Sequence, residues 1–431
     1  MERSDRLILI SPGSLTEETT MRNPLKRLLA LLFSFALIAA ACGSDATDAV
    51  DGVTDAAEDV ADDAMEEGEG AVDEAMEEGD EAMDDEAMDD EAMDAMSDHS
   101  LAEHCPATVI IQLDWNPEAE HGAMYEMIGD DYTIDAENFV VSGSLVSGGE
   151  DTGVDIEIRT GGPAIGFQQV TAQMYQDTDI HFGYISTDEA IENYNDLPTT
   201  SFVAPLEKNP QIIMWDPATY PEAETIADLP EETIIRYFGG ASYIPFLLDQ
   251  GIVTDAQLDD TYDGQPSVFV AEQGAIAQQG FASAEPYVYE NEVPEWGKPV
   301  AYQLIHDTGF EIYAAAIGAR SGDFEELTPC IAAITPVIQQ AQVDYVNSPA
   351  GTNELIIEAV EAYDNGWVYS AAVADFSVEA QLSNGLVGNG PDATLGNFDL
   401  ARVQSVIDIV GAEMTPEDLV TNEFIDDSIG L

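Results

Sequence analysis

The sequence predicts an α/β fold from about residue 103 to the C-terminus of the 431-residue chain. Two observations lead to this prediction. Short apolar, β-branched runs such as 109–113 and 154–158 alternate with stretches of helical pattern. Several runs also end in residues suited to open a helix, as at Ser186-Thr187-Asp188-Glu189, which has the spacing of a capping box.

The charge of the chain excludes some classes of partner. It contains 86 acidic residues against 11 lysines and arginines, which gives a formal net charge of −75. Such a surface has no basic face to neutralise phosphates, so we expect no nucleic-acid partner. Its self-repulsion favours a soluble monomer. The three cysteines, Cys42, Cys105 and Cys330, lie in no C-x-x-C or histidine-rich setting, and we expect neither a metal site nor a cofactor.

Residues 1–41 have the pattern of a signal peptide, with Met21 as a second candidate start. A basic stretch at 22–27 precedes an apolar run at 28–38, which is shorter than the roughly 20 residues that span a membrane. Small residues then lead to Cys42. This junction resembles a bacterial lipoprotein cleavage site, which implies lipidation of Cys42 and a protein anchored at the outer face of the cell membrane or in the periplasm. The alternative is an ordinary secreted protein.

Residues 42–103 form the predicted acidic linker. The unit Asp-Glu-Ala-Met recurs, as at 85–88 and 90–93, in a spacing that fits neither a heptad nor a calcium loop. Because like charges at this density oppose a stable helix, we expect a solvated, extended spacer. Weak cation binding and an interaction tail stay open as alternatives.

The first strand of the α/β region ends in the most distinctive loop of the chain. Asp114, Trp115 and Asn116 follow the run 109–113, and His121 and Tyr125 fall in a helix predicted over 119–128. Ligands of open α/β sheets bind beyond the carboxyl ends of strands, where Trp115 would offer a flat ring and one N–H donor. Alternatively, Trp115 packs in the core and Asp114 caps the helix.

The strings Leu-Asp-Trp-Asn-Pro at 113–117 and His-Gly-Ala-Met-Tyr at 121–125 resemble the solute-binding proteins of ABC importers for nitrate, sulfonate, taurine and thiamine-pyrimidine precursors, in the thiamine pyrimidine synthase-like superfamily. The resemblance is distributed over 109–431 and includes Glu285-Pro286 and the tail at 421–425. It implies a type II periplasmic-binding-protein fold, in which two doubly wound lobes are joined by hinge strands. The first lobe would comprise 104–217 and 305–431, and the second 218–304.

The expected elements follow in order. In the first lobe we expect an inserted β-hairpin within 129–153, strands at 154–158 and 179–185, a helix at 165–175, and two more strands at 202–205 and 211–215. In the second lobe we expect strands at 233–237 and 267–270, with a helix ending at 250. Strands at 300–305 and 312–317 would return to the first lobe, followed by helices at 329–347 and 353–365.

The resemblance also implies that both lobes contribute ligand-binding residues from their strand ends. Besides Asp114, Trp115, Asn116, His121 and Tyr125, the candidates are Arg159, Gly161, Gly162, Tyr184, Ser186, Thr187, Tyr237, Gly239, Ser242, Ser283, Glu285 and Tyr287. The glycines would let the backbone approach a ligand. Arg159 has a surface ion pair as its alternative role, and Glu285 a helix cap. Cys105 and Cys330 would both fall in the first lobe, where an oxidising compartment favours a disulfide.

These observations favour a binding lipoprotein that closes over a small solute and delivers it to an ABC permease. The alternatives are a ligand-sensing lipoprotein and an enzyme like thiamine pyrimidine synthase. The five histidines are scattered, and the sequence contains no Gly-x-Ser-x-Gly elbow, so we expect no catalytic residues and no enzyme. Because cations are scarce, a multiply charged anion is disfavoured, and the frequent aromatic rings favour a heterocycle such as a pyrimidine or a flavin. Nitrate, a sulfonate or taurine is the alternative ligand.

Overall fold

The structure, a computed structural model, describes residues 100–431. The predicted signal peptide, Cys42 and the acidic linker up to residue 99 lie outside the described residues. Residues 100–431 fall within a single contact unit of the chain. Within this range, no helix combines the length and the apolar character that a membrane span requires.

The first sheet has seven strands, and β1 (Thr108–Gln112) lies at its centre. The apolar residues of β1 lie on both faces of the strand, which is typical of a strand buried between two helix layers. β1 pairs in parallel with β4 and β5, and β12 runs antiparallel between β5 and β6. In spatial order the strands are β2 (Thr133–Asp135), β3 (Val140–Ser147), β4 (Glu150–Arg159), β1 (Thr108–Gln112), β5 (Phe182–Ile185), β12 (Ala316–Arg320) and β6 (Thr199–Val203).

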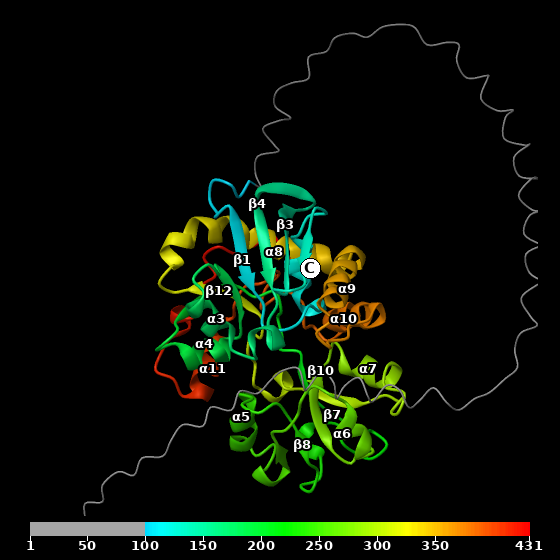
Figure 1. The fold of residues 1–431 in the computed structure, drawn as a ribbon. Helices are drawn as coiled ribbons and strands as arrows, with labels where there is room; N and C mark the ends of the chain where they lie inside the picture. Colours follow the sequence, from blue (N-terminus) through cyan, green and yellow to red (C-terminus); the bar gives the residue numbers. More distant parts are fainter. Residues whose placement is uncertain (1–99) are drawn as a thin grey trace, which may run out of the picture. The chain divides into compact units, whose positions relative to one another are not determined.

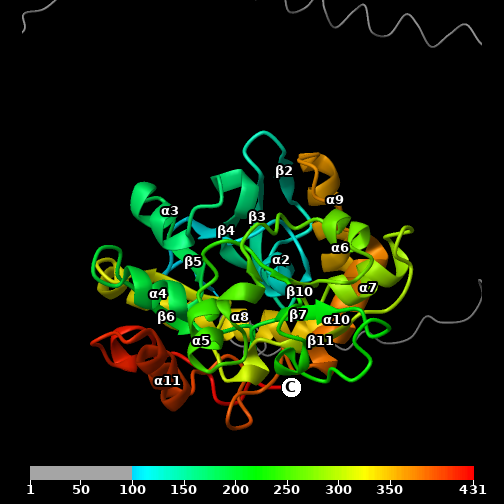
Figure 2. The same cartoon turned by 90° about the horizontal axis from the view of Figure 1, so that it is seen from below.

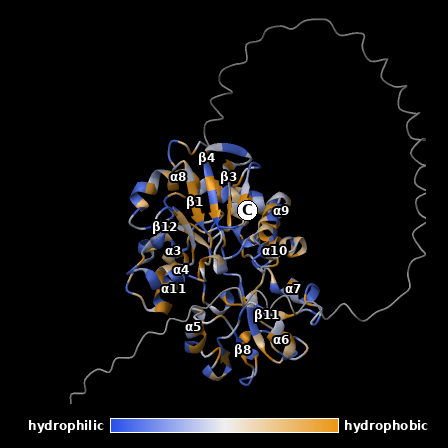
Figure 3. Ribbon diagram, in the orientation of Figure 1, coloured by the Kyte–Doolittle hydropathy of each residue, from blue (hydrophilic) through white to orange (hydrophobic). Residues whose placement is uncertain are grey.

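Helices cover both faces of this sheet, as Figures 1 and 2 show. One face packs on a core shared with the long helix α8, and the other on a core shared with α3, α4 and α11. Figure 3 shows β1 as an apolar strand between these layers. The first layer holds η2 (Ala119–His121), α2 (Gly122–Glu126), α8 (Phe324–Asn347), α9 (Ala350–Tyr363) and α10 (Ala371–Ser383), and the second holds α3 (Val170–Gln176), α4 (Thr187–Asn193) and α11 (Leu400–Val410).

The second sheet has five shorter strands and forms the lower body in Figure 1. β8 pairs in parallel with β10 and β9, whereas β7 is antiparallel to β10 and β11. The spatial order is β11 (Ala301–Leu304), β7 (Gln211–Trp215), β10 (Ala277–Phe281), β8 (Ile235–Arg236) and β9 (Leu258–Asp259). The accompanying helices are η4 (Ile226–Asp228), α5 (Tyr243–Asp249), η5 (Asp255–Gln257), α6 (Ser267–Ala271), α7 (Glu285–Asn291) and η6 (His306–Thr308).

The two sheets repeat one topology. The order β4-β1-β5-β12 in the first sheet corresponds to β9-β8-β10-β7 in the second, and in both the fourth strand is antiparallel to the third. Segments 204–210 and 305–315 carry the chain between the sheets. The predicted α/β fold of two doubly wound lobes, the type II periplasmic-binding-protein arrangement, is therefore confirmed. Neither of the two crossing segments, 204–210 and 305–315, contains a named strand.

Three predictions about single elements are wrong. The apolar run at 267–270 is part of helix α6, because so short a run does not distinguish a strand from a buried helical turn and Pro266 sits at the helix start. The strand at 211–215, expected in the first sheet, is β7 of the second. The strand at 300–305, expected to return to the first sheet, is β11 at the edge of the second. Helices α10 and α11 were not predicted.

The inserted segment 129–153 forms the predicted hairpin. β3 pairs with both β2 and β4, and the tight turn between β3 and β4 contains Gly148 and Gly149, both with positive φ. On the same lobe, a disulfide joins Cys105, which precedes β1, to Cys330 in α8. It closes a loop with a sequence separation of 225 and ties the start of the sheet to its longest helix.

The short helices η3 (Gly162–Ile165) and η7 (Pro416–Asp418) complete the fold. η3 follows β4 and leads into α3, and η7 is followed by Val420, which forms an isolated bridge with Ser201 in β6. The C-terminal tail thus extends the edge of the first sheet. A backbone hydrogen bond from the Leu395 N–H to the Ile429 carbonyl, at 3.0 Å, holds its last residues.

Candidate functional site

Trp115 lies where the two lobes meet. It leaves β1 at the carboxyl edge of the first sheet, and its ring centroid lies 5.9 Å from that of Phe167 and 6.1 Å from that of Trp367. The third neighbour, Phe238, lies 6.3 Å away and follows β8 of the second lobe. Trp115 is half-buried. The loops that follow β1 and β8 therefore place aromatic rings where the two lobes meet.

Gly161 and Gly162 pack against the loop that carries Trp115. Their N–H groups donate to the carbonyls of Trp115 and Asp114, each at 2.9 Å. A Cβ on Gly161 would lie 2.3 Å from the carbonyl oxygen of Leu113, and one on Gly162 would lie 2.8 Å from the Trp115 ring. Their small size lets two backbone segments approach each other, and their N–H groups are already engaged within the protein.

His121 supports the carboxylate of Asp114. Its Nε2 lies 2.8 Å from Asp114 Oδ1, and the imidazole is almost completely buried. The ring of Tyr184 packs edge-on against it with centroids 5.1 Å apart, and the Tyr184 hydroxyl donates to the carbonyl of Glu120 at 3.3 Å. His121 and Tyr184, both predicted to bind ligand, are thus buried behind the exposed Asp114 and hold its side chain in place.

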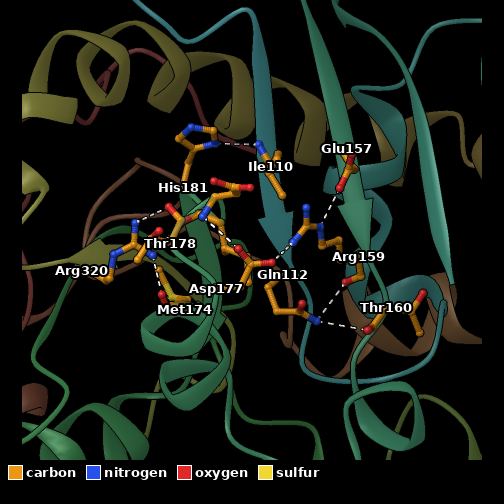
Figure 4. Close-up of polar contacts among 12 residues, drawn as sticks. Ile110, Gln112, Glu157, Arg159, Thr160, Met174, Asp177, Thr178, His181 and Arg320 are labelled. Atoms are coloured by element: carbon orange, nitrogen blue, oxygen red, sulfur yellow. Dashed lines mark hydrogen bonds and ion pairs between the residues drawn. The ribbon is translucent and has the colours of Figure 1, made fainter. Parts of the chain in front are cut away.

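Asn116, Tyr125 and Arg159 make contacts within the first lobe. The Asn116 side-chain oxygen accepts a hydrogen bond from Asn365 at 2.9 Å. Tyr125 is buried and lines a separate hollow between α2 and α9. Arg159 donates to Glu157 at 2.6 Å and to Asp177 at 2.7 Å, as Figure 4 shows, so its cationic group has the ion-pair role left open above.

A cavity of about 240 Å³ lies between the lobes. Asp114 and Ser186 line it from strand ends of the first lobe, and Ser242 lines it from the loop before α5 in the second. Both crossing segments contribute as well. Its remaining lining residues are Gln169, Asp188, Glu189, Glu192, Asn209, Gln211, Gly240, Ala241, Tyr243, Phe281, Ile312 and Ala314. Three of the predicted candidates, Asp114, Ser186 and Ser242, thus meet at this cavity.

Thr187 and Asp188 begin helix α4 at the wall of this cavity. The buried Thr187 hydroxyl accepts the N–H of Tyr313 at 3.1 Å, which fixes the second crossing segment to the first lobe. Asp188, which the sequence reasoning did not select, accepts a hydrogen bond from the Ser242 hydroxyl across the gap. Among residues 100–431, its Oδ1 has no hydrogen-bond partner, although Asp188 is only 8% exposed.

The candidates of the second lobe divide between the cavity and its surroundings. Tyr237 is half-buried and lines a larger, open hollow between α5 and α11. Gly239 lies beside the carbonyl of Asp260. The ring of Tyr287 packs against Phe376 of α10 with centroids 5.4 Å apart. Among the predicted candidates of the second lobe, only Ser242 lines the interlobe cavity.

Ser283 and Glu285 stand at a second contact between the lobes. The buried Ser283 hydroxyl donates to the carboxylate of Glu120. Glu285, the first residue of α7, accepts the N–H of Phe281 at 2.6 Å and so closes the loop before its own helix. Burial raises the pKa of Glu285 to about 7, with a further contribution from the charge of Glu120. The structure thus gives Glu285 a role close to the predicted cap.

Carboxylates gather around this contact. Burial raises the pKa of Glu118 well above its usual value, and the charges of Glu120, Asp114 and Glu285 raise it further. On the cavity side, burial raises the pKa of Glu189 to about 7, helped by Asp188 and Asp114. Asp114 therefore acts on both groups. The sequence does show Glu118 and Glu120 beside the tryptophan loop, but acids at a helix start are also typical of simple capping.

Comparison with known proteins gives neighbours in structure alone. No family model and no curated protein matches the chain. A solved structure from Bordetella bronchiseptica is 15% identical with a TM-score of 0.48, covering 74% of this chain and 96% of that one. The ligand-binding component of an ABC-type import system from Staphylococcus aureus, with zinc bound, is 9% identical with a TM-score of 0.48, covering 74% and 100%. A periplasmic aliphatic sulphonate-binding protein from Escherichia coli is 13% identical with a TM-score of 0.40, covering 66% and 89%. Identities this low do not carry a ligand from one protein to another.

Proposed function

We infer that the chain is an extracytoplasmic solute-binding protein, which captures a small molecule between its lobes and delivers it to an ABC permease. The interlobe cavity of about 240 Å³ carries this proposal, because both lobes and both crossing segments line it. A solute held there would contact both lobes and both crossing segments. Its binding would therefore favour the closed arrangement over the open one.

Contacts between the lobes fit reversible closure. The hydrogen bonds from Ser242 to Asp188 and from Ser283 to Glu120 join the lobes through small polar groups. The contact between Trp115 and Phe238 adds one aromatic pair. Polar contacts of this kind exchange with water at small net cost, so opening need not expose a large apolar core.

The cavity size narrows the ligand class. A cavity of about 150 Å³ accommodates benzene, so about 240 Å³ has room for one ring with one or two small substituents. A pyrimidine such as a thiamine precursor fits this size, whereas a three-ring flavin would need a wider opening of the lobes. Nitrate and sulfonates are disfavoured because acidic side chains line the cavity. The aromatic residues Tyr243 and Phe281 line the cavity and suit a heterocycle.

Anchoring at Cys42 would hold this binding protein beside its permease. The lipoprotein-like junction in the sequence supports that part of the proposal. Expression of the intact gene should give a membrane-associated protein, and Cys42→Ser should shift it to the soluble fraction with the mass of the unlipidated chain. Equal distribution of the two forms would contradict the anchor.

The capture function is tested with the full-length protein. Native mass spectrometry should detect a co-purifying small molecule, and a thermal-shift screen of pyrimidines, thiamine precursors, amines, amino acids and sulfonates should find solutes that raise the melting temperature. Ala314→Leu would fill part of the cavity and abolish these shifts. Ala333→Leu, in a separate hollow along α8, is the matched control and should retain them. No shift with any solute, or equal shifts in both variants, would refute the proposal.

A further inference from the structure

We propose that the interlobe cavity selects a small organic cation, with Asp188 as the carboxylate that receives its charged N–H or N-alkyl group. This inference rests on the proposed capture function and specifies the charge of the solute. Asp188 lines the cavity and is 92% buried, since its exposure is 8%. One of its oxygens accepts from Ser242, and the other has no hydrogen-bond partner among residues 100–431.

A buried carboxylate oxygen without a partner is unfavourable in an isolated protein. Removing a charged oxygen from water costs free energy that hydrogen bonds or an opposite charge must offset. At this place the fold supplies the Ser242 hydroxyl to one oxygen only. An organic cation in the cavity would place an opposite charge beside this carboxylate.

The cavity is acidic without a compensating base. Asp114, Glu189 and Glu192 line it together with Asp188. Among residues 100–431, no lysine, arginine or histidine side chain lines it. The cations of this range are Arg159, Lys208, Arg236, Lys298, Arg320 and Arg402. Five of them pair with carboxylates that do not line the cavity, and Lys208 lies beside Gly385 after α10.

The surroundings extend this preference for positive charge. The carboxylates of Glu118 and Glu120 follow Asp114 in the same loop and helix start, and Glu285 lies across the lobe contact. Two aromatic residues, Tyr243 and Phe281, line the cavity itself. Aromatic faces attract organic cations and are common where quaternary ammonium groups are bound.

The arrangement suits an organic cation better than a metal ion. In the part of the chain that the structure describes, no three histidine, cysteine, aspartate or glutamate side chains are placed to hold one metal ion. The acids are distributed around the cavity, whereas divalent ions need several oxygens converging on one point. An ammonium, amidinium or aromatic cation spreads its charge and its donors over several atoms, and so can contact distributed carboxylates.

Matched solutes that differ in charge test the inference on the full-length protein. The charged and uncharged pairs are aminomethylpyrimidine with hydroxymethylpyrimidine, benzylamine with benzyl alcohol, and choline with its carbon isostere dimethylbutanol. Benzoate, methanesulfonate, zinc and calcium ions complete the set. Isothermal titration calorimetry is run on the wild type, Asp188→Asn and the control Glu231→Gln, which changes an exposed carboxylate outside the cavity. Glu192→Gln replaces Asp188→Asn if the latter fails to fold.

The expected result is that at least one cation binds at least tenfold more tightly than its uncharged partner, and that Asp188→Asn removes that preference while Glu231→Gln keeps it. Tighter binding of an uncharged solute or an anion, a preference unchanged by Asp188→Asn, or saturable binding of a metal ion lost in Asp188→Asn would overturn the inference and leave solute capture standing. If no solute of any charge binds here or in the thermal-shift screen, the proposed function itself fails.

Discussion

Substituting Glu189 by glutamine should stabilise the ligand-free protein at pH 8 and flatten the pH dependence of its stability. Glu189 follows Asp188 at the wall of the interlobe cavity. One of its oxygens accepts the N–H of Thr171 at 2.8 Å. Burial, with the charges of Asp188 and Asp114, raises the pKa of Glu189 from 4.5 to about 7.

The sign of the effect follows from proton binding in the two states. The unfolded chain releases this proton near pH 4.5, whereas the folded protein keeps it to about pH 7. Between these values the folded state binds more protons, so the free energy of unfolding falls as the pH rises. The contribution is complete below pH 4.5 and is lost above about pH 7. Glutamine keeps the neutral shape and the acceptor for Thr171, so the variant escapes this loss.

The magnitude is bounded by the gap between the two pKa values. Each pH unit between the two pKa values, 4.5 and about 7, corresponds to about 1.4 kcal/mol, which gives roughly 3 to 4 kcal/mol as an upper limit for Glu189 at pH 8. Glu285, whose pKa burial also raises to about 7, should behave in the same way. If the two contributions add, the double variant should gain up to about 7 kcal/mol. Solvent access within the cavity will reduce both figures.

Urea denaturation between pH 5 and pH 8 measures the effect on the wild type, Glu189→Gln, Glu285→Gln and the double variant. Glu231→Gln controls for the general relief of repulsion in so acidic a chain, because Glu231 is exposed. The unfolding free energies of wild type and Glu189→Gln should converge near pH 5 and diverge toward pH 8. Parallel pH profiles, or an equal gain in Glu231→Gln, would refute the assignment of a neutral carboxyl to Glu189.

Three further outcomes are expected. Replacing Cys105 and Cys330 by serine should lower the free energy of unfolding by up to about 5 kcal/mol, given the sequence separation of 225, and an unchanged urea midpoint would contradict a stabilising role. Gly161→Ala should lower it by about 1–3 kcal/mol, because the added Cβ would lie 2.3 Å from the carbonyl oxygen of Leu113; wild-type stability in urea would show that the two loops separate freely. Trp115→Ala should lower the free energy of unfolding by about 2 kcal/mol through the loss of its three aromatic contacts, and an unchanged urea midpoint would show that these contacts do not stabilise the fold.

The fold was predictable because strand and helix patterns alternate over most of residues 100–431. The sequence pattern does not show which strands pair with one another. β7 is apolar on both faces, so nothing in its sequence tells which of two sheets it joins. Helix α10 was missed because its buried and exposed positions differ little in hydropathy, and α6 because five residues are too few to show a helical period.

The candidate site was predictable where topology decides it. Asp114 and Ser186 follow parallel strands, and their place at one edge of the first sheet follows from that order. Ser242 occupies the corresponding loop of the second lobe. His121 and Tyr184 lie behind this edge as supports, a distinction that depends on side-chain direction and burial. Asp188 was missed because an acid in the first turn of a helix is usually explained by the helix dipole alone.

General acidity does not account for the chemistry of the cavity. In a chain with a net charge of −75, carboxylates are expected on every surface, where water solvates them and salt screens them. The same composition leaves few cations, and nearly all of those in the described range are engaged by nearby acids. Asp188 differs from the surface acids, since it is 8% exposed and one of its oxygens lacks a partner within residues 100–431. We therefore base the proposed positive charge of the solute on this buried carboxylate beside the cavity, and not on the general acidity of the chain.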